Sequence, residues 1–393
     1  MKIILYILRI HFEIIYFFIK LLTFQKNRVY LLSRQFDKPS LNYQMIINEL
    51  EKEHIKYKVV CKKVDTSIND SVRTQGNYSN VSSLIKKVFK NAKSSIKYYL
   101  SLWSQMINIA NSKIVIVDGY NLPVCLLKHK KGTLVIQLWH ALGAIKKFGY
   151  QSMGKVDGIS PTVAKILKMH AGYDYVISGS EGMAPYFAEA FNTPLEKVLN
   201  IGTPTVDYLR ESRPEVKKEI LKKYPVLKKK INVLYSPTFR NNKNFNYQDL
   251  IENTDFDKVN LIITYHFKVE EICDDKRVVT IPSSDFSVFD VLTICDYVIS
   301  DYSALLVDAA VSNKKILMYV YDYDEYNKNN GVNIKMLEDF KKISSKSAKE
   351  IMNIIQKDKY DYKTYQKFQQ MYTTDKKLSS TKELMKIIKK NLK

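Results

Sequence analysis

Short apolar runs recur along the chain and alternate with longer stretches in which apolar side chains repeat every three or four residues. The runs are rich in Val, Ile and Leu and end near Gly, Pro, Asp or Ser, which is typical of buried strands in parallel sheets. The longer stretches predict amphipathic helices. Strands that alternate with helices indicate an α/β fold whose parallel sheets are covered on both faces. The predicted strands lie at residues 28–34, 57–62, 113–119, 132–140, 173–180, 231–240, 259–267, 278–283, 295–303 and 314–320.

The strands fall into two sets, which predict two Rossmann-type domains facing each other across a cleft. A polar helical stretch at residues 212–230 contains two prolines and separates the sets. We therefore predict an N-terminal Rossmann-like domain at residues 27–212, a C-terminal one at residues 213–374 and a final helix at residues 375–393.

Residues 1–26 predict an amphipathic helix that lies on a membrane surface. Charges at Lys2, Arg9, Glu13 and Lys20 interrupt the apolar sequence too often for a transmembrane span, which needs about 20 apolar residues. At about 100° per residue these four side chains share one narrow stripe of the helix, and Ile, Leu and Phe occupy most of the rest. A helix packed against the core of its own domain is the alternative interpretation.

The formal net charge of +22 favours a polyanionic partner, although a lysine-rich composition contributes to it. Residues 82–110 predict a basic helix in which lysines alternate with aromatic side chains. Such a helix can bind single-stranded nucleic acid or anionic lipid. The neighbouring N-terminal helix favours anionic membrane lipids, and we expect no nucleic acid partner. The four cysteines lack metal-binding spacing and predict reduced thiols in the cytoplasm.

Polar side chains that could act in catalysis or ligand binding directly follow several predicted strands. In open α/β sheets ligands bind beyond the carboxyl ends of the strands. Residues from both halves are therefore expected to meet at one site. These residues are His140, Arg240, His266 and the run Ser300, Asp301, Tyr302 and Ser303.

The residue types at these strand ends suit a phosphate-bearing substrate. A histidine is the usual general base near neutral pH, and His140 is followed by Lys146 and Lys147. The guanidinium of Arg240 can make forked hydrogen bonds to phosphate oxygens. Each residue also has a structural explanation, such as a buried histidine, a surface ion pair or a solvated turn. The chain has no glycine-rich P-loop and no G-x-G-x-x-G motif.

Five motifs follow one another along the chain. They read LWHALGAIKKFGY, NIGTPTVDYL, YSPTFR, ISDYSALLVDAAV and KKILMYVYDYDEYNKNNG. In this order they resemble the CDP-glycerol glycerophosphotransferase family of teichoic acid synthesis, and the resemblance extends from about residue 28 to residue 371. The histidine motif, with Ala141, looks most like the glycerophosphate primase members. Two departures are Thr205, where the family usually has arginine, and Phe267, where many members have proline.

The resemblance implies a GT-B fold and a peripheral enzyme on the cytoplasmic face of the cell membrane. The enzyme would move glycerol phosphate from CDP-glycerol to an undecaprenyl-diphosphate-linked disaccharide and release CMP. The acceptor would bind the N-terminal domain and CDP-glycerol the C-terminal one. No firmly bound cofactor is implied, a divalent metal ion is not required, and homo-oligomer formation is left open.

The resemblance also assigns roles to residues. His140 and His266 would be catalytic, with His140 as the base. The residues implied to bind CDP-glycerol are Lys146, Lys147, Thr238, Arg240, His266, Ser300, Asp301, Tyr302, Ser303 and Asp308.

Several alternatives remain open at this stage. The chain could be a teichoic acid polymerase that uses CDP-glycerol or CDP-ribitol, or a GT-B glycosyltransferase that uses a nucleotide sugar. A nucleic-acid-binding protein and a non-catalytic membrane adaptor are the other two classes.

Overall fold

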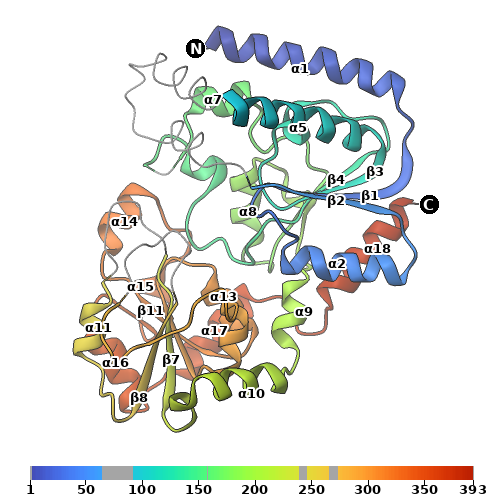
Figure 1. Cartoon of the computed structure of the whole chain (residues 1–393). Helices are drawn as coiled ribbons and strands as arrows, with labels where there is room; N and C mark the ends of the chain where they lie inside the picture. The colour runs from blue at the N-terminus through green and yellow to red at the C-terminus, as the bar shows by residue number, and fades with distance from the viewer. Residues whose placement is uncertain (1, 64–91, 157, 239–245, 265–272, 393) are drawn as a thin grey trace.

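The computed structural model describes residues 2–63, 92–156, 158–238, 246–264 and 273–392 (Figure 1). It contains two sheets of six strands each, and every strand pair within them is parallel. The first sheet has the order β2-β1-β3-β4-β5-β6 and the second β12-β11-β10-β7-β8-β9. The strands are β1 (Lys26–Ser33), β2 (Tyr57–Cys61), β3 (Ser112–Val117), β4 (Leu134–Gln137), β5 (Tyr175–Ile177), β6 (Val198–Leu199), β7 (Ile231–Tyr235), β8 (Val259–Ile263), β9 (Val279–Thr280), β10 (Tyr297–Ser300), β11 (Lys315–Tyr319) and β12 (Ser344–Ser345).

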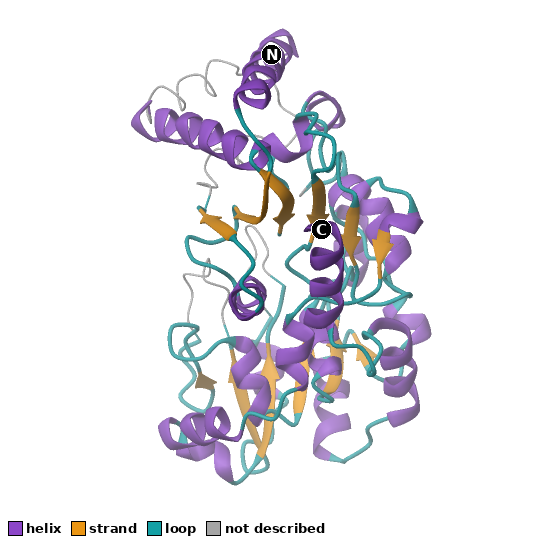
Figure 2. Ribbon diagram, turned by 90° about the vertical axis from the view of Figure 1, so that its right-hand side faces the viewer, coloured by secondary structure: helices purple, strands orange, loops and turns teal. Residues whose placement is uncertain are grey.

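Helices cover both faces of each sheet, as predicted for parallel strands (Figure 2). All ten predicted strands are present. Strand β1 is one residue longer than predicted, the other nine are shorter, and the two-residue edge strands β6 and β12 were not predicted. Such short strands carry too few apolar residues to form a pattern. The helices are α1 (Lys2–Leu22), α2 (Leu41–Lys52), α5 (Ala92–Ala110), α6 (Leu122–Leu126), α7 (Pro161–Ile166), α8 (Ala184–Phe191), α9 (Thr205–Arg210), α10 (Pro214–Lys223), α11 (Gln248–Glu252), α12 (Val288–Val291), α13 (Leu305–Val311), α14 (Tyr323–Asn329), α15 (Met336–Asp339), α16 (Ala348–Gln356), α17 (Tyr362–Tyr372) and α18 (Ser380–Leu392).

Alternate side chains of the first sheet enter two separate cores. Val29 and Leu31 of β1 pack with Ile46 of α2, whereas Tyr30 and Leu32 pack on the opposite face. This alternation follows from the two-residue period of a strand. The strands read as continuous apolar runs because both of their faces are buried.

The C-terminal helix α18 returns to the first sheet and lies beside α2 (Figure 1). Leu384, Met385 and Ile388 are buried in the same core as β1 and β3. Asp207 at the end of the first half accepts hydrogen bonds from the backbone N–H groups of Ser380 (3.1 Å) and Thr381 (2.8 Å) and so holds the start of this helix. The final helix therefore covers one face of the first sheet. The domain boundaries expected from the sequence remain predictions.

Helix α1 forms where the sequence predicts a helix and packs on α5 and α7. Phe12, Tyr16 and Ile19 are its buried side chains. No helix in the part of the chain that the structure describes is long and apolar enough to cross a membrane. The predicted basic helix is described only from Ala92, so the lysines at 86, 87 and 90 lie outside the described residues.

Candidate functional site

The strands of both sheets run toward the region between them (Figure 2). His140 follows β4 of the first sheet, and Ser300 ends β10 of the second. The two regions are packed closely. A Cβ atom at Gly143 would lie only 2.6 Å from Val307 Cγ2 on α13, so there is room for glycine but not for a larger residue. The loop after His140 therefore contacts the helix that follows Ser303, as the strand-end rule predicts.

The backbone before His140 is held in an unusual conformation. Trp139 has φ of +58°, in the left-handed region that bulky residues rarely adopt. The buried amide of Gln137 accepts a hydrogen bond from Trp139 N (3.0 Å) and donates one to Gly119 O (3.2 Å). The Trp139 ring stacks on Phe148, with centroids 4.8 Å apart. Residues held in this way concentrate at functional sites.

His140 has the geometry of a general base. Its Nδ1 lies 3.0 Å from the carbonyl oxygen of Asp118. Because a carbonyl oxygen can only accept, Nδ1 carries the proton and the lone pair of Nε2 is free. The ring remains open to solvent, yet the surrounding protein lowers the pKa of His140 by desolvation, and Lys146 lowers it further. The neutral form thus predominates at physiological pH.

The two lysines after His140 lie where the halves meet. Lys146 is exposed and forms a backbone bridge with Val332, and the Lys147 N–H donates to Gly331 O at 3.0 Å. The backbone of both lysines therefore contacts the second half, and the charge of Lys146 acts on the candidate base.

Asn333 of the second half joins the same loop through its side chain and backbone. Its Nδ2 donates to Ala144 O (2.8 Å) and to Gln151 Oε1 (3.1 Å), and its backbone N–H donates to Ile145 O (2.8 Å). Gln151 Nε2 in turn donates to Asn333 Oδ1 (3.0 Å). This residue fixes the loop of His140 against the second half.

Replacing Asn333 with alanine is expected to lower turnover about tenfold, because a few hydrogen bonds of about 1 kcal/mol each no longer hold the halves together. The measurement is the rate of the reaction that the family resemblance implies, release of CMP from CDP-glycerol. Asn327→Ala is the matched control, since Asn327 Oδ1 accepts from Val332 N (3.0 Å) within the second half alone. Equal losses in both variants would contradict the role of Asn333 between the halves.

In the second half, the turns after β7 and β10 are tied together. Asp301 Oδ1 accepts hydrogen bonds from the backbone N–H groups of Thr238 (2.8 Å) and Tyr302 (2.7 Å). The Tyr302 hydroxyl donates to Asp322 Oδ1 (2.9 Å), and Ser303 Oγ accepts from Leu305 N (3.2 Å). The predicted residues Thr238, Asp301 and Tyr302 thus form one buried structural unit.

Within the run from Ser300 to Ser303, Ser303 is half-buried and the other three residues are buried. The Ser300 hydroxyl donates a hydrogen bond to the backbone oxygen of Ser236. Asp308 on α13 is buried, which raises the pKa of its carboxyl to about 7. Asp118 beside His140 is buried as well, and burial raises its pKa to about 6. Arg240 and His266 lie outside the described residues, so their predicted roles remain predictions.

Three residues of the site were not predicted from the sequence: Asp118, Gln137 and Asn333. Asp118 follows β3 directly and Gln137 ends β4, so the rule that selected His140 could have found them. Asn333 follows no strand, and no sequence signal marks it. Among the described residues no group of three or more His, Cys, Asp or Glu side chains could hold a metal ion.

Two parallel sheets that meet at their carboxyl edges define a GT-B-like α/β protein. The solved wall teichoic acid polymerase TagF shares this fold with a TM-score of 0.67 and 18% identity, covering 94% of this chain and 90% of that chain. A UDP-GlcNAc 2-epimerase from Neisseria meningitidis, solved with UDP-GlcNAc, has a TM-score of 0.55 and 13% identity, covering 92% of this chain and 99% of that chain. At these identities the likeness shows the fold alone.

The chain belongs to the CDP-Glycerol:Poly(glycerophosphate) glycerophosphotransferase family, which matches residues 14–390. The family predicted from the five motifs is confirmed, and it is a family of phosphotransferase enzymes.

Three curated relatives show how far the similarity extends. The teichoic acid glycerol-phosphate primase of Bacillus subtilis (strain 168) is 32% identical over 272 residues, which cover 65% of this chain and 68% of the relative. The ribitol-phosphate primase of Bacillus spizizenii is 31% identical over 259 residues, covering 62% and 66%. The poly(ribitol-phosphate) polymerase of Bacillus spizizenii is 29% identical over 300 residues, covering 72% and 48%. The chain thus spans about two thirds of the two primases and about half of the polymerase.

Proposed function

We propose that the chain transfers glycerol phosphate from CDP-glycerol to an undecaprenyl-diphosphate-linked disaccharide, releases CMP and so primes a teichoic acid chain. The observation that carries this proposal is His140, whose Nδ1 is held by the Asp118 carbonyl so that Nε2 keeps its lone pair, and whose pKa is lowered by desolvation and by Lys146. The glycerol-phosphate primase of Bacillus subtilis supports the donor and the priming role, and TagF has been solved with CDPG.

In this reaction His140 Nε2 takes the proton of the acceptor hydroxyl. The acceptor oxygen then forms a bond to the β-phosphorus of CDP-glycerol, and the bond from that phosphorus to the oxygen of CMP breaks. CMP leaves with the electron pair, and the proton remains on the imidazole until solvent removes it. Positioning and electrostatic stabilisation dominate in phosphoryl transfer, which suits a site with one base and several positive charges.

The positive charges of Lys146 and Lys147 would offset those of the donor diphosphate. Arg240 and His266, predicted from the resemblance, would add to this effect from the second half. Ser303 is the best placed hydroxyl of the 300–303 run, since it is half-buried and follows β10. Positive groups aimed at a departing phosphate lower the free energy of the transition state.

Ribitol phosphate is the second candidate for the transferred group, because the ribitol-phosphate primase is 31% identical and the glycerol-phosphate primase 32% identical. The test is CMP release with a disaccharide-lipid acceptor analogue and either CDP-glycerol or CDP-ribitol, with UDP-sugars as a third group of donors. Acceptor-dependent release with CDP-glycerol supports the main proposal. Release with CDP-ribitol alone would identify CDP-ribitol as the donor. Release with neither nucleotide would contradict both the glycerol-phosphate and the ribitol-phosphate proposals.

Helix α1 supports a location on the cytoplasmic face of the membrane. Its polar stripe is turned toward the protein, since Glu13 pairs with Arg9 (3.0 Å) and Lys168 (3.5 Å), and Lys20 Nζ donates to Lys128 O at 2.9 Å. The apolar side chains on the rest of the helix are exposed. They are Ile3, Ile4, Ile7, Leu8, Ile10, Ile14, Phe17, Phe18, Leu21 and Leu22.

A contiguous apolar face of this kind usually marks a membrane or protein contact, and an interfacial helix inserts such a face among lipid headgroups. We therefore expect anionic membrane lipids to bind it. Formation of a homo-oligomer remains an open prediction.

Substituting Phe17 with glutamate is expected to weaken binding to vesicles of anionic phospholipid about tenfold, because a buried aromatic side chain contributes about 1.5–3 kcal/mol. Sedimentation of the protein with the vesicles measures the change. Val226→Glu is the matched control, since Val226 is 53% exposed and Phe17 is 54% exposed, and Val226 lies in the second half. Similar loss in both variants would show that α1 is not the membrane contact.

A further inference from the structure

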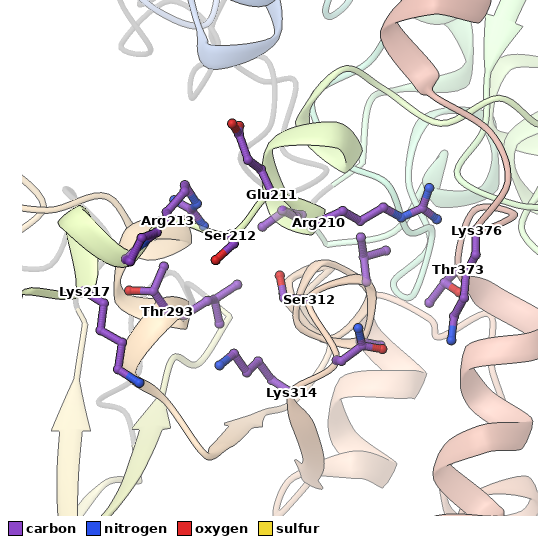
Figure 3. Close-up of a pocket in the computed structure, with 16 residues that line it drawn as sticks. Arg210, Glu211, Ser212, Arg213, Lys217, Thr293, Ser312, Lys314, Thr373 and Lys376 are labelled. Atoms are coloured by element: carbon purple, nitrogen blue, oxygen red, sulfur yellow. The ribbon is translucent and has the colours of Figure 1, made fainter.

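A pocket of about 490 Å³ lies where the chain crosses between its two halves (Figure 3). The crossings are the segment between α9 and α10 and the segment between α17 and α18, and both contribute to the pocket wall. Residues just before β10 and β11 complete the wall. The pocket therefore lies at the amino edge of the second sheet, opposite to the edge that faces His140.

The charged side chains in the wall are mostly positive. Figure 3 shows the single carboxylate, Glu211, turned away from Lys217 and Lys314. The five cationic side chains come from three stretches of the chain, at residues 209–217, 310–314 and 373–376. They are Arg210, Arg213, Lys217, Lys314 and Lys376.

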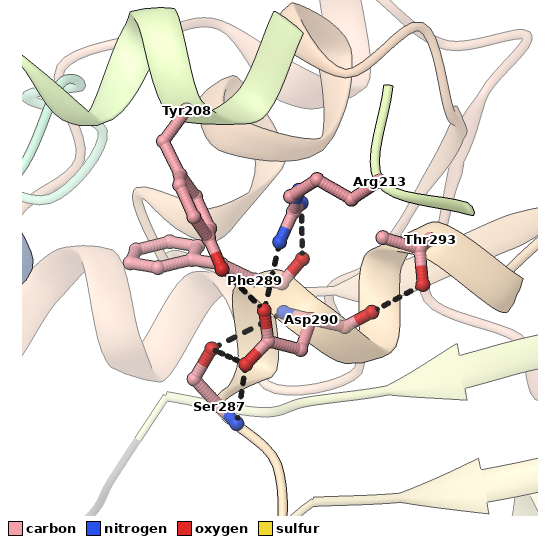
Figure 4. A network of polar contacts seen from close by, with 6 residues as sticks. All are labelled: Tyr208, Arg213, Ser287, Phe289, Asp290 and Thr293. Carbon is pink, nitrogen blue, oxygen red and sulfur yellow. Dashed lines mark hydrogen bonds and ion pairs between the residues drawn. The ribbon is translucent and has the colours of Figure 1, made fainter. Parts of the chain in front are cut away.

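Arg213 holds its place through a network of polar contacts (Figure 4). Its guanidinium pairs with Asp290 Oδ1 at 2.7 Å and donates to Phe289 O at 2.9 Å. Asp290 also accepts from the Tyr208 hydroxyl (2.6 Å) and closes a capping box with Ser287. The carboxylate of Asp290 thus balances the charge of Arg213, and the Arg213 side chain forms a rigid part of the pocket wall.

Arg210 is equally fixed, although it forms no ion pair among the described residues. Its two terminal nitrogens donate to backbone oxygens of the second crossing, Leu378 O (2.9 Å) and Thr374 O (2.6 Å). The carboxylates of Asp207 and Asp375 also act on its charge, so Arg210 ties the two crossings together.

The three lysines form no ion pair within the part of the chain that the structure describes. Lys217 and Lys376 are exposed, whereas Lys314 is half-buried. Burial lowers the pKa of the Lys314 amine, Asp296 raises it, and the like charges of Lys217 and Arg213 lower it. A half-buried ammonium beside like charges is unfavourable without an anion.

A solvated basic surface is the simpler explanation of lysines in a chain of net charge +22. A lysine on such a surface is free to turn into water, away from like charges. Lys314 instead stands half-buried in the wall of a pocket. Helix α10 also begins in this wall, where Arg213, Pro214 and Lys217 line the pocket.

We propose that this pocket binds a phosphate or diphosphate anion, held by Lys217 and Lys314 beside the rigid wall that Arg213 forms. The proposal does not depend on the transferase activity, and its test measures binding alone.

The test is isothermal titration of the full chain with sodium pyrophosphate, and separately with sodium phosphate, at constant ionic strength. The double variant Lys217→Ala/Lys314→Ala is expected to bind at least tenfold more weakly than the parent. Lys218→Ala/Lys222→Ala removes the same charge from the exposed side of α10 and is expected to bind like the parent.

The candidate donor site could also bind pyrophosphate, so a third variant separates the two. Lys146→Ala/Lys147→Ala is expected to retain the binding that Lys217→Ala/Lys314→Ala loses. The opposite pattern would place the anion beside His140 and overturn the proposal. Absence of saturable binding in the parent, or equal losses in the pocket variant and the α10 control, would overturn it as well.

Discussion

Replacement of His140 by alanine is expected to lower acceptor-dependent CMP release about a thousandfold, since a positioned general base contributes about 10²–10⁴ in rate. The fold should persist, because the imidazole makes one described hydrogen bond, to the Asp118 carbonyl, and a single bond is worth about 1 kcal/mol. The measurement is CMP release with CDP-glycerol and a disaccharide-lipid analogue, together with circular dichroism of both proteins.

His54→Ala is the matched control, because His54 is exposed at the end of α2, outside the site. A His140 variant that keeps the parent rate would exclude this residue as the base. Loss of ordered structure would require the more conservative His140→Asn, which retains a side-chain donor for the same carbonyl.

The pH dependence gives an independent check on His140. Its pKa is lowered by desolvation, so the neutral base forms at lower pH than for an ordinary histidine. The rate should rise as the pH rises through this lowered pKa and then level off. We expect the acidic limb of the parent to lie below pH 6.5, the ordinary histidine value. A limb above that value would contradict the assignment.

Substitution of Ile388 with alanine is expected to lower the free energy of unfolding by about 2–5 kcal/mol, the usual cost of emptying such a buried site. Ile388 is fully buried against the first sheet, in the core that contains Val29 and Ile114. Chemical denaturation measures the loss. Ile387→Ala is the matched control, because the neighbouring side chain is partly exposed and should cost less.

Hydrogen exchange can show which sheet depends on α18. Exchange in β1 and β3 should become faster in the Ile388 variant, whereas β7 and β10 should change little. Faster exchange in the second sheet alone would mean that the helix stabilises a different part of the molecule.

Much of the fold follows from local pattern. The strand that ends at Gln137 is recognisable because both of its faces are buried, so its residues are apolar without interruption. His140 could be chosen for the same reason, since parallel strands deliver their ends to one edge. Arg240 and His266 were chosen in this way too, and both lie outside the described residues.

Contacts between distant segments could not be predicted in this way. Asn333 resembles any loop asparagine in the sequence, and it gains its partners because the second half places it against Ala144 and Gln151. Asp301 was predicted to bind the substrate, whereas folding brings its carboxylate to the backbone N–H of Thr238.

The class of fold, the order of the elements, the family and the choice of His140 could all be predicted from periodicity and short motifs. Three features could be seen only in the folded chain: α18 covers one face of the first sheet, α1 turns its polar stripe inward, and five cationic side chains gather around one pocket. Each of these depends on which surfaces pack together. Apolar burial is favourable against many surfaces, so the partner is chosen by the shape of the whole chain.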